Sequence, residues 1–207
     1  MNKAEFRTHC ISQARREKVH NKLYKEHLLM NKLENFIIQY GAKKVLIYLP
    51  FGFELNITPL IKRLRKRVEL YTPFMEGESF KMVTFRLPLE KKKYGIYEPR
   101  VSYKKIKNID IAIVPIIGLD REAKRVGYGK GMYDRFFEKL DKKPIKIFIQ
   151  PRLCKSEKSI CDAYDIDADF LLSPQGSYCK TRIKNVKRSS LRRWYSHPKR
   201  RRRLFCL

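Results

Sequence analysis

Short apolar runs alternate with segments of helical periodicity along most of the chain, and this alternation restricts the fold more than any other feature. Residues 3–40 contain neither Pro nor Gly and carry apolar side chains at helical spacing up to Gly41, which predicts one or two amphipathic helices. Further helices are predicted at residues 58–66 and 131–140, and strands at residues 45–49, 68–71, 81–87, 110–114, 145–149 and 168–172. The alternation predicts a three-layer α/β/α domain with a mostly parallel central sheet.

The length of 207 residues suits one domain of this kind followed by a tail. We expect the domain to cover residues 1–172, because the periodic pattern fades near Ser173. Residues 173–207 are expected to form a basic extension that need not be ordered. No acidic residue follows Asp169, and residues 199–203 read Lys-Arg-Arg-Arg-Arg.

The formal net charge of +27 favours anionic partners, namely nucleotides, polyanionic metabolites or nucleic acid. In the extension, Trp194 and Tyr195 stand among arginines, a mixture that is typical of proteins that bind single-stranded RNA. A charged tail without a folded recognition module instead gives weak, salt-sensitive and non-specific contact with nucleic acid. We favour the second interpretation, so small molecules are the expected main partners.

The remaining composition predicts a cytoplasmic protein with no membrane segment, and a monomer is favoured. No apolar run approaches the roughly 18 residues that a membrane-spanning helix needs, and the first residues are charged rather than apolar. The five cysteines form no Cys-x-x-Cys pair and are odd in number, so we expect free thiols at Cys10, Cys154, Cys161, Cys179 and Cys206.

A glycine-rich segment after the predicted strand at 110–114 is the part of the sequence that indicates chemistry. Residues 125–135 read Arg-Val-Gly-Tyr-Gly-Lys-Gly-Met-Tyr-Asp-Arg. Glycines let backbone N–H groups approach a ligand closely, a helix that begins near Gly131 favours an anion, and Arg125 and Lys130 add positive charge. Asp134 offers an oxygen ligand of the kind that Mg²⁺ prefers. The segment therefore predicts a cradle for a nucleotide polyphosphate, although it matches neither the Walker A nor the dinucleotide pattern.

The whole string resembles the signature of the 5-formyltetrahydrofolate cyclo-ligase family, in which Arg-x-Gly-x-Gly-x-Gly-x-Tyr-Asp follows a Val-Pro strand and an Asp-Arg loop. The resemblance extends in consistent order over roughly residues 1–172. It includes Lys-x-x-x-Arg at residues 3–7, Leu-Pro-Phe-Gly-Phe-Glu at 49–54, Tyr-Gly-Ile-Tyr-Glu-Pro at 94–99, and the acidic segment at 164–169.

The resemblance implies an enzyme that uses ATP and Mg²⁺ to cyclise 5-formyltetrahydrofolate to 5,10-methenyltetrahydrofolate. It assigns catalytic roles to Lys130 and Arg125, and metal binding to Asp134 and Asp169, with Asp165 and Asp167 as alternatives to Asp169. Folate would contact Leu49, Glu54, Tyr128, Gly129, Lys130, Gly131 and Met132. ATP would contact Lys3, Ala4, Glu5, Phe6, Arg7, Arg125, Val126, Gly127, Tyr128, Gly129, Lys130, Gly131, Met132 and Tyr133.

Two alternatives stay open at this point. The chain is a nucleic-acid-binding protein that acts through its arginine-rich extension, or it is another nucleotide-using enzyme on the same scaffold. The second alternative would keep the glycine segment but would have no use for Glu54 or for the pair Lys3 and Arg7.

Overall fold

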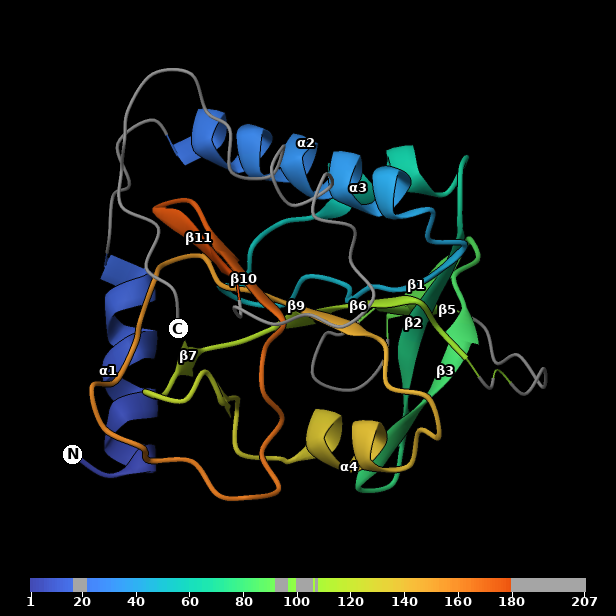
Figure 1. The fold of residues 1–207 in the computed structure, drawn as a ribbon. Helices are drawn as coiled ribbons and strands as arrows, with labels where there is room; N and C mark the ends of the chain where they lie inside the picture. The colour runs from blue at the N-terminus through green and yellow to red at the C-terminus, as the bar shows by residue number, and fades with distance from the viewer. Residues whose placement is uncertain (17–21, 92–96, 100–105, 107, 180–207) are drawn as a thin grey trace.

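The computed structural model of the chain describes residues 1–16, 22–91, 97–99, 106 and 108–179. Its centre is a seven-stranded sheet with the strand order β11-β10-β9-β6-β1-β2-β3 (Figure 1). The five inner strands run parallel, and each of the two outer strands is antiparallel to its neighbour. The strands are β1 (Lys44–Leu46), β2 (Glu69–Glu76), β3 (Ser79–Thr84), β6 (Ile111–Pro115), β9 (Ile145–Ile149), β10 (Phe170–Ser173) and β11 (Gly176–Cys179).

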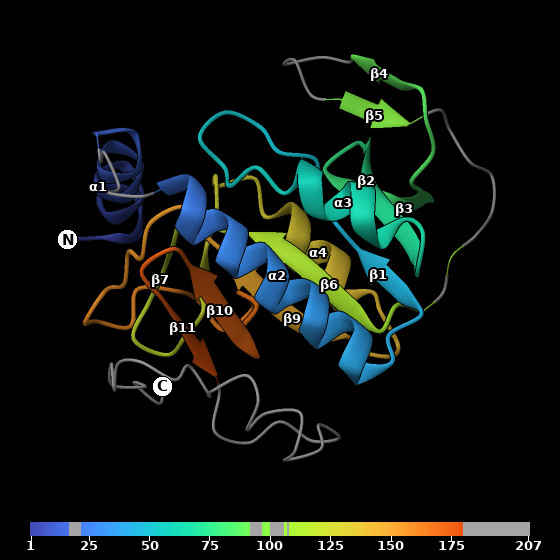
Figure 2. The same ribbon diagram turned by 90° about the horizontal axis from the view of Figure 1, so that it is seen from above.

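Helices cover both faces of this sheet, which confirms the predicted α/β fold with a mostly parallel sheet. The long helix α2 (Lys22–Tyr40) and α3 (Thr58–Leu64) lie on one face, and α4 (Met132–Glu138) lies on the other. The first helix, α1 (Lys3–Arg16), stands apart from these three and packs beside β7 (Gly118–Leu119) (Figure 2). Two small antiparallel pairs complete the fold: β7 with β8 (Arg125–Val126), and β4 (Leu89–Lys91) with β5 (Tyr97–Pro99).

Successive side chains of a strand point to opposite faces of the sheet, and this alternation produces the two main cores. In β9, Ile145, Ile147 and Ile149 join the apolar cluster under α2 and α3, whereas Phe148 joins the cluster under α4. A strand buried on both faces reads as a continuous apolar run, which is why β6 and β9 were recognisable from the sequence. A third, smaller cluster seats α1.

The start of α1 is fixed by local hydrogen bonds. The side-chain oxygen of Asn2 accepts from the backbone N–H groups of Ala4 (3.0 Å) and Glu5 (2.9 Å), and the Glu5 carboxylate accepts from the backbone N–H of Asn2 (2.9 Å). This reciprocal capping arrangement satisfies N–H groups that have no partner inside the helix. Glu5 therefore stabilises the helix end.

Differences from the predicted elements are concentrated at their ends. The sheet continues past residue 172 through β11, which pairs with β10 from Phe170 to Cys179. Residues 180–207 and residues 94–96 of the 94–99 segment lie outside the described residues. No helix in the described part of the chain is long and apolar enough to cross a membrane.

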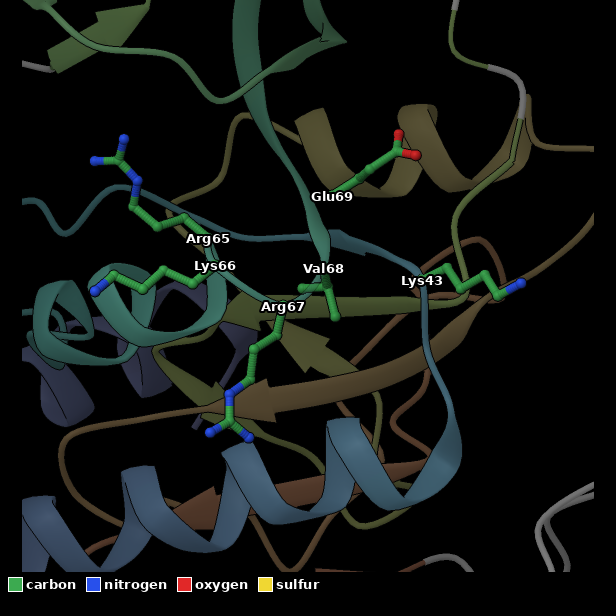
Figure 3. A pocket seen from close by; sticks show the side chains of 6 residues that line it. All are labelled: Lys43, Arg65, Lys66, Arg67, Val68 and Glu69. Carbon is green, nitrogen blue, oxygen red and sulfur yellow. The ribbon is translucent and has the colours of Figure 1, made fainter.

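A hollow of about 340 Å³ lies at the amino ends of β1 and β2. It is lined by Lys43, Arg65, Lys66, Arg67, Val68 and Glu69 (Figure 3), and the long cationic side chains point in different directions rather than converging. Because the inner strands are parallel, this hollow is at the opposite edge of the sheet from the glycine segment, which follows the carboxyl end of β6. The hollow is therefore separate from the predicted site.

Candidate active site

The candidate site lies where open parallel sheets place ligands, beyond the carboxyl ends of adjacent strands. The segment after β1 carries Glu54, and the segment after β6 passes through β7 and β8 into the glycines at 127–131. The two segments meet at Phe53 and Tyr128, whose ring centroids are 5.9 Å apart. Side chains separated by more than seventy residues in the sequence are thus brought together.

Arg125 is the buried cation at the centre of this site, with an exposed fraction of 6%. Its guanidinium carbon lies 4.9 Å from the centroid of the Tyr133 ring, and its Nη1 lies 3.4 Å from Oδ2 of Asp134. Its Nε has no hydrogen-bond partner among the residues that the structure describes. A buried charged donor without a partner is unusual and marks a place where a ligand can bind.

Gly127 is the glycine whose small size the site requires. A Cβ atom built at this position would lie 2.5 Å from the guanidinium atoms of Arg125, so any other residue would displace that group. Gly129 and Gly131 differ, because their φ angles of 95° and 60° lie in the left-handed region that favours glycine. One glycine makes room for Arg125, and two allow the turns that lead into α4.

Two side chains of α1 reach the same segment. Arg7 donates a hydrogen bond of 2.7 Å from Nε to the carbonyl oxygen of Gly127. Lys3 donates to the carboxylates of Asp165 and, at 3.2 Å, Asp162. Arg7 and Lys3 therefore attach the first helix to two distant parts of the chain that border the site.

The other residues of the predicted 3–7 segment have different environments. Phe6 is buried in the small cluster that seats α1, with Ile117 and Val126. A Cβ at Gly118 would lie 2.7 Å from the Phe6 ring, so this glycine lets the helix approach closely. Ala4 and Glu5 are exposed. Phe6 supports the position of α1, and within residues 3–7 only Lys3 and Arg7 direct positive charge toward the loops.

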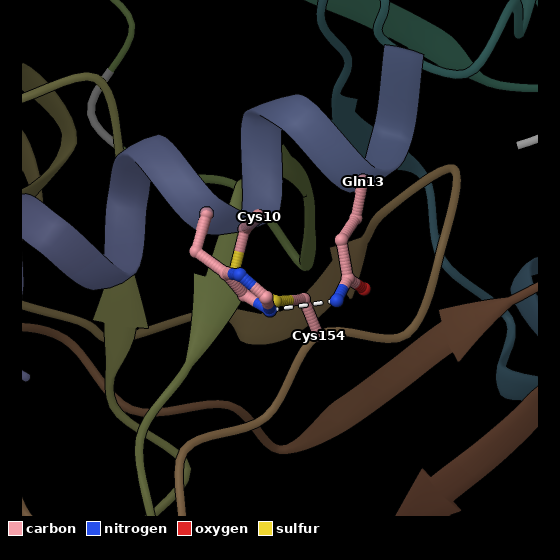
Figure 4. Close-up of a disulfide and its surroundings, with 4 residues drawn as sticks. Cys10, Gln13 and Cys154 are labelled. Carbon is pink, nitrogen blue, oxygen red and sulfur yellow. Dashed lines mark hydrogen bonds between the residues drawn. A yellow bond between two sulfur atoms is a disulfide. The ribbon is translucent and has the colours of Figure 1, made fainter. Parts of the chain in front are cut away.

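A disulfide fixes the same helix, which is a correction to the sequence prediction. Cys10 of α1 and Cys154, in the segment after β9, form a disulfide with a Cα–Cα distance of 5.8 Å (Figure 4). The prediction of free thiols is wrong for these two residues, because folding brings together positions 144 residues apart that the sequence spacing did not relate. Cys161 is a free thiol, as predicted.

Glu54 is the acidic group of the site and has an unusual protonation behaviour. Burial raises its pKa from 4.5 to about 7, while a backbone hydrogen bond and the positive charge of Arg125 act in the opposite direction. Its Oε2 accepts a hydrogen bond of 3.0 Å from the backbone N–H of Phe51. Burial and the nearby Glu54 charge also raise the pKa of the Tyr128 and Tyr133 hydroxyls. Near neutral pH, Glu54 can therefore both donate and accept a hydrogen bond.

The remaining predicted contact residues differ in exposure. Tyr128, Gly129 and Lys130 are exposed at the tip of the glycine segment, and the Lys130 carbonyl oxygen accepts from Arg135 Nη2 at 2.5 Å. Met132 packs against the core under α4, and Leu49 packs against the core under α2. Lys130 is thus placed where its ammonium group can approach a ligand from solvent.

The two predicted metal ligands have separate partners. Asp134 faces Arg125 with one carboxylate oxygen, and its other oxygen accepts from the backbone N–H of Ile166 at 3.2 Å. Asp169 precedes β10 and accepts from the backbone N–H of Lys146 at 2.7 Å. Within the described part of the chain, no group of three or more His, Cys, Asp or Glu side chains could hold a metal ion. A magnesium site made by Asp134 and Asp169 stays a prediction.

Two further buried polar groups lie near the site. Asp165 is 8% exposed and pairs with Lys3. Gln150, directly after β9, is fully buried, and neither end of its side-chain amide has a hydrogen-bond partner among the described residues. Asp165 was visible only as one of several aspartates between residues 162 and 169, and a single Gln after a strand carries no signal.

The fold and this arrangement define an α/β protein with a cationic, glycine-lined ligand site, and comparison with known proteins gives its family. The model of the 5-formyltetrahydrofolate cyclo-ligase family matches residues 1–153. The chain therefore belongs to the 5-formyltetrahydrofolate cyclo-ligase family.

Curated relatives carry the same family name. A 5-formyltetrahydrofolate cyclo-ligase from Haemophilus influenzae is 27% identical over 110 residues, which are 49% of this chain and 59% of that protein. The enzyme of that name from Escherichia coli (strain K12) is 29% identical over 103 residues, 45% of this chain and 57% of the relative. The matched regions thus span less than two thirds of the length of these relatives.

Solved structures are similar over a larger part of the chain. The NMR structure of Aquifex aeolicus 5,10-methenyltetrahydrofolate synthetase has a TM-score of 0.74 and 25% identity, covering 90% of this chain and 97% of the other. A synthetase structure from Mycoplasma pneumoniae has a TM-score of 0.63 and 20% identity, covering 83% of this chain and 97% of the other. The second likeness shows the fold alone.

Proposed function

We propose that the chain is an ATP-dependent 5-formyltetrahydrofolate cyclo-ligase that forms 5,10-methenyltetrahydrofolate, ADP and phosphate. In this reaction the formyl oxygen of the folate takes the terminal phosphoryl group of ATP, and ADP is released. The folate's other amine nitrogen then attacks the formyl carbon, and the C–O bond breaks so that phosphate leaves with the former formyl oxygen. The reaction needs a site that neutralises phosphate charge and holds two substrates side by side.

The observation that supports this proposal most is the meeting of three distant elements. Arg7 of α1 contacts Gly127, Arg125 lies against the same glycine, and Phe53 and Tyr128 join this segment to the loop that carries Glu54. The family signature covers all three elements. A simple structural turn would not require a buried arginine beside a glycine with no room for a Cβ atom.

The cations are suited to the phosphoryl-transfer half of the reaction. Fixed positive groups stabilise the charge that develops as the phosphoryl group moves, and they cost little reorganisation because the fold already holds them. Arg7 and Arg125 are held by Gly127 and Asp134, and the exposed Lys130 can reach the transferred group. Lys3 would add charge at the same edge.

Glu54 is suited to recognition of the folate. A carboxyl group that titrates near neutral pH can accept hydrogen bonds from the N–H groups of a pterin edge, or donate one when protonated. Tyr128 and Phe53 beside it offer aromatic surface for a flat ring. These residues would orient the formyl group toward the glycine segment.

The two predicted ligands, Asp134 and Asp169, do not fit a resident Mg²⁺ ion as the structure places them. Both oxygens of the Asp134 carboxylate face protein groups, and Asp169 binds the backbone elsewhere. Magnesium commonly reaches enzymes of this kind together with the phosphates of its nucleotide. We therefore treat Mg²⁺ as part of the substrate, Mg·ATP, and derive no step from an ion held by this chain.

The test is a direct assay of cyclisation. Methenyltetrahydrofolate absorbs in the near ultraviolet, so protein mixed with Mg·ATP and 5-formyltetrahydrofolate should produce a growing absorbance band. Lys130→Ala should lower turnover by about tenfold or more, whereas Lys139→Ala, an exposed lysine at the end of α4, should not. A folded protein that gives no band with these substrates contradicts the proposed function.

A further inference from the structure

Asp134 and Arg125 form a buried ion pair in the glycine segment. Asp134 is 8% exposed and Arg125 6%, and the distance from Nη1 to Oδ2 is 3.4 Å. The second carboxylate oxygen is held by the backbone N–H of Ile166. Asp134 is therefore anchored at one oxygen and directed at Arg125 with the other.

The surroundings of the guanidinium leave little freedom on its remaining sides. The ring of Tyr133 lies against it at 4.9 Å, and Gly127 borders it with no space for a Cβ atom. Within the described part of the chain, Asp134 is the hydrogen-bond partner of this group, and Nε has none. One donor is therefore engaged with a carboxylate, and Nε is buried without a partner among the described residues.

An arginine that binds phosphate depends on the direction of its planar fork of N–H groups. A buried guanidinium without a carboxylate beside it would also be costly, because its charge would be uncompensated in a region with little water. Asp134 meets both needs: its charge compensates that of Arg125 in the interior, and its Oδ2, held in place because Oδ1 accepts from Ile166, accepts a hydrogen bond from the fork.

We propose that Asp134 is a positioning residue that holds Arg125 in the orientation that binds nucleotide phosphate, and that it is not a ligand of Mg²⁺. The inference rests on the proposed function, since it takes ATP as the ligand of Arg125. It assigns to Asp134 a role that is exerted without any metal ion, and this separates it from a metal ligand.

The experiment measures binding of ATP in EDTA, where no divalent cation is present, by isothermal titration. Asp134→Asn keeps an oxygen that can accept from Ile166 but removes the charge that faces Arg125. D134N should weaken this metal-free binding by about tenfold. In the Arg125→Met background, D134N should change ATP binding less than twofold, because the group that Asp134 positions is gone.

The matched control is Asp110→Asn. The Asp110 carboxylate binds the backbone of Lys43 and Lys44 at the other edge of the sheet. D110N should bind ATP as the wild type does.

Four outcomes overturn the inference. The first is metal-free binding by D134N equal to that of the wild type, with only a higher Mg²⁺ concentration needed for activity. The second is a loss of ATP affinity that is equally large when D134N is introduced into the wild type and into R125M. The third applies if D134N alone does not fold. The double variant R125M/D134N should then melt at the same temperature as R125M. A lower melting temperature of the double variant would show that Asp134 does not act through Arg125. The fourth is wild-type binding of ATP that requires Mg²⁺ and is absent in EDTA. A wild-type protein that binds ATP neither in EDTA nor with Mg²⁺ contradicts the proposed function itself, and this result is distinct from the four above.

Discussion

Arg7, on the first helix, donates a hydrogen bond of 2.7 Å from its Nε to the carbonyl oxygen of Gly127, a residue 120 positions further along the chain. The same guanidinium lies over Gly129, where a Cβ atom would be 3.5 Å from its Cζ. The N-terminal helix is thus in direct contact with the glycine segment, and the conformation of that segment depends on how α1 is seated.

Replacement of Arg7 should weaken nucleotide binding. Arg7→Ala removes a charge-assisted hydrogen bond and is expected to raise the KM for ATP by about tenfold, with a smaller effect on the KM for the folate. Arg7→Lys should recover only part of the loss, because an ammonium group lacks the Nε–H and its planar fork. The measurement is steady-state kinetics with each substrate varied in turn.

Arg16→Ala is the control for this substitution, since it removes an exposed arginine from the last turn of the same helix. Its kinetics should match the wild type. Equal losses in R7A and R16A would mean that only the total charge of α1 matters, which contradicts a specific role for Arg7.

Gly127→Ala should destabilise the protein and impair the site at the same time. The added methyl group would lie 2.5 Å from the guanidinium of Arg125, so that group must move away from Asp134. We expect a loss of about 1–3 kcal/mol in the free energy of unfolding, measured by chemical denaturation, together with weaker ATP binding.

Gly77→Ala separates this clash from backbone strain. Gly77 has a φ of 59°, but no atom lies within 4 Å of a Cβ built there. Gly77→Ala should lower the free energy of unfolding by about 1 kcal/mol and leave ATP binding intact. If G127A were no more harmful than G77A in both measurements, the close packing of Arg125 on Gly127 would be refuted.

Glu54 should make stability depend on pH near neutrality. Because the pKa of this carboxyl is raised from 4.5 to about 7 in the folded protein, the folded state holds the proton more tightly than the unfolded state. The stabilising contribution of the protonated form is fully present below pH 4.5 and is lost as the pH rises through 7. Glu54→Gln should therefore unfold at a higher temperature than the wild type at pH 8, with a gain of about 3 kcal/mol at most.

The gain should shrink progressively between pH 7 and pH 5, where the wild-type carboxyl takes up its proton. Thermal melting of both proteins across this range is the measurement. A difference between E54Q and the wild type that stays constant from pH 5 to pH 8 would show that the pKa of Glu54 is not raised.

Reduction of the Cys10–Cys154 disulfide should lower stability. The bond closes a loop with a sequence separation of 144 residues, and loss of a cross-link of this kind costs about 2–5 kcal/mol. The Cys10→Ser/Cys154→Ser double variant should melt at the temperature of the reduced wild type, and dithiothreitol should not lower it further. Cys161→Ser, which removes the described free thiol, should respond to the reductant as the wild type does.

Local patterns in the sequence were sufficient for the architecture. Helices and buried strands have periods that can be read within a window of several residues. The strands β6 and β9 were therefore predicted close to their observed bounds, and α2 ends where the helical pattern of residues 3–40 was predicted to end. The short pairs β7–β8 and β4–β5 were not predicted, because strands of two or three residues have no measurable period. The glycine segment was recognisable because its residues are contiguous and its order matches a known family.

Contacts between distant residues were decided only by the tertiary structure. The sequence supplied Arg125, Asp134, Lys3 and Cys10 as separate candidates, and chain folding determined that the first two face each other, that Lys3 meets Asp165, and that Cys10 meets Cys154. Which partner a side chain meets depends on the packing of whole helices and strands against one another, and no local spacing encodes it. The sequence alone thus determined the fold class and predicted an anion-binding segment, whereas the packing of α1 and α4 determined which charges are paired there.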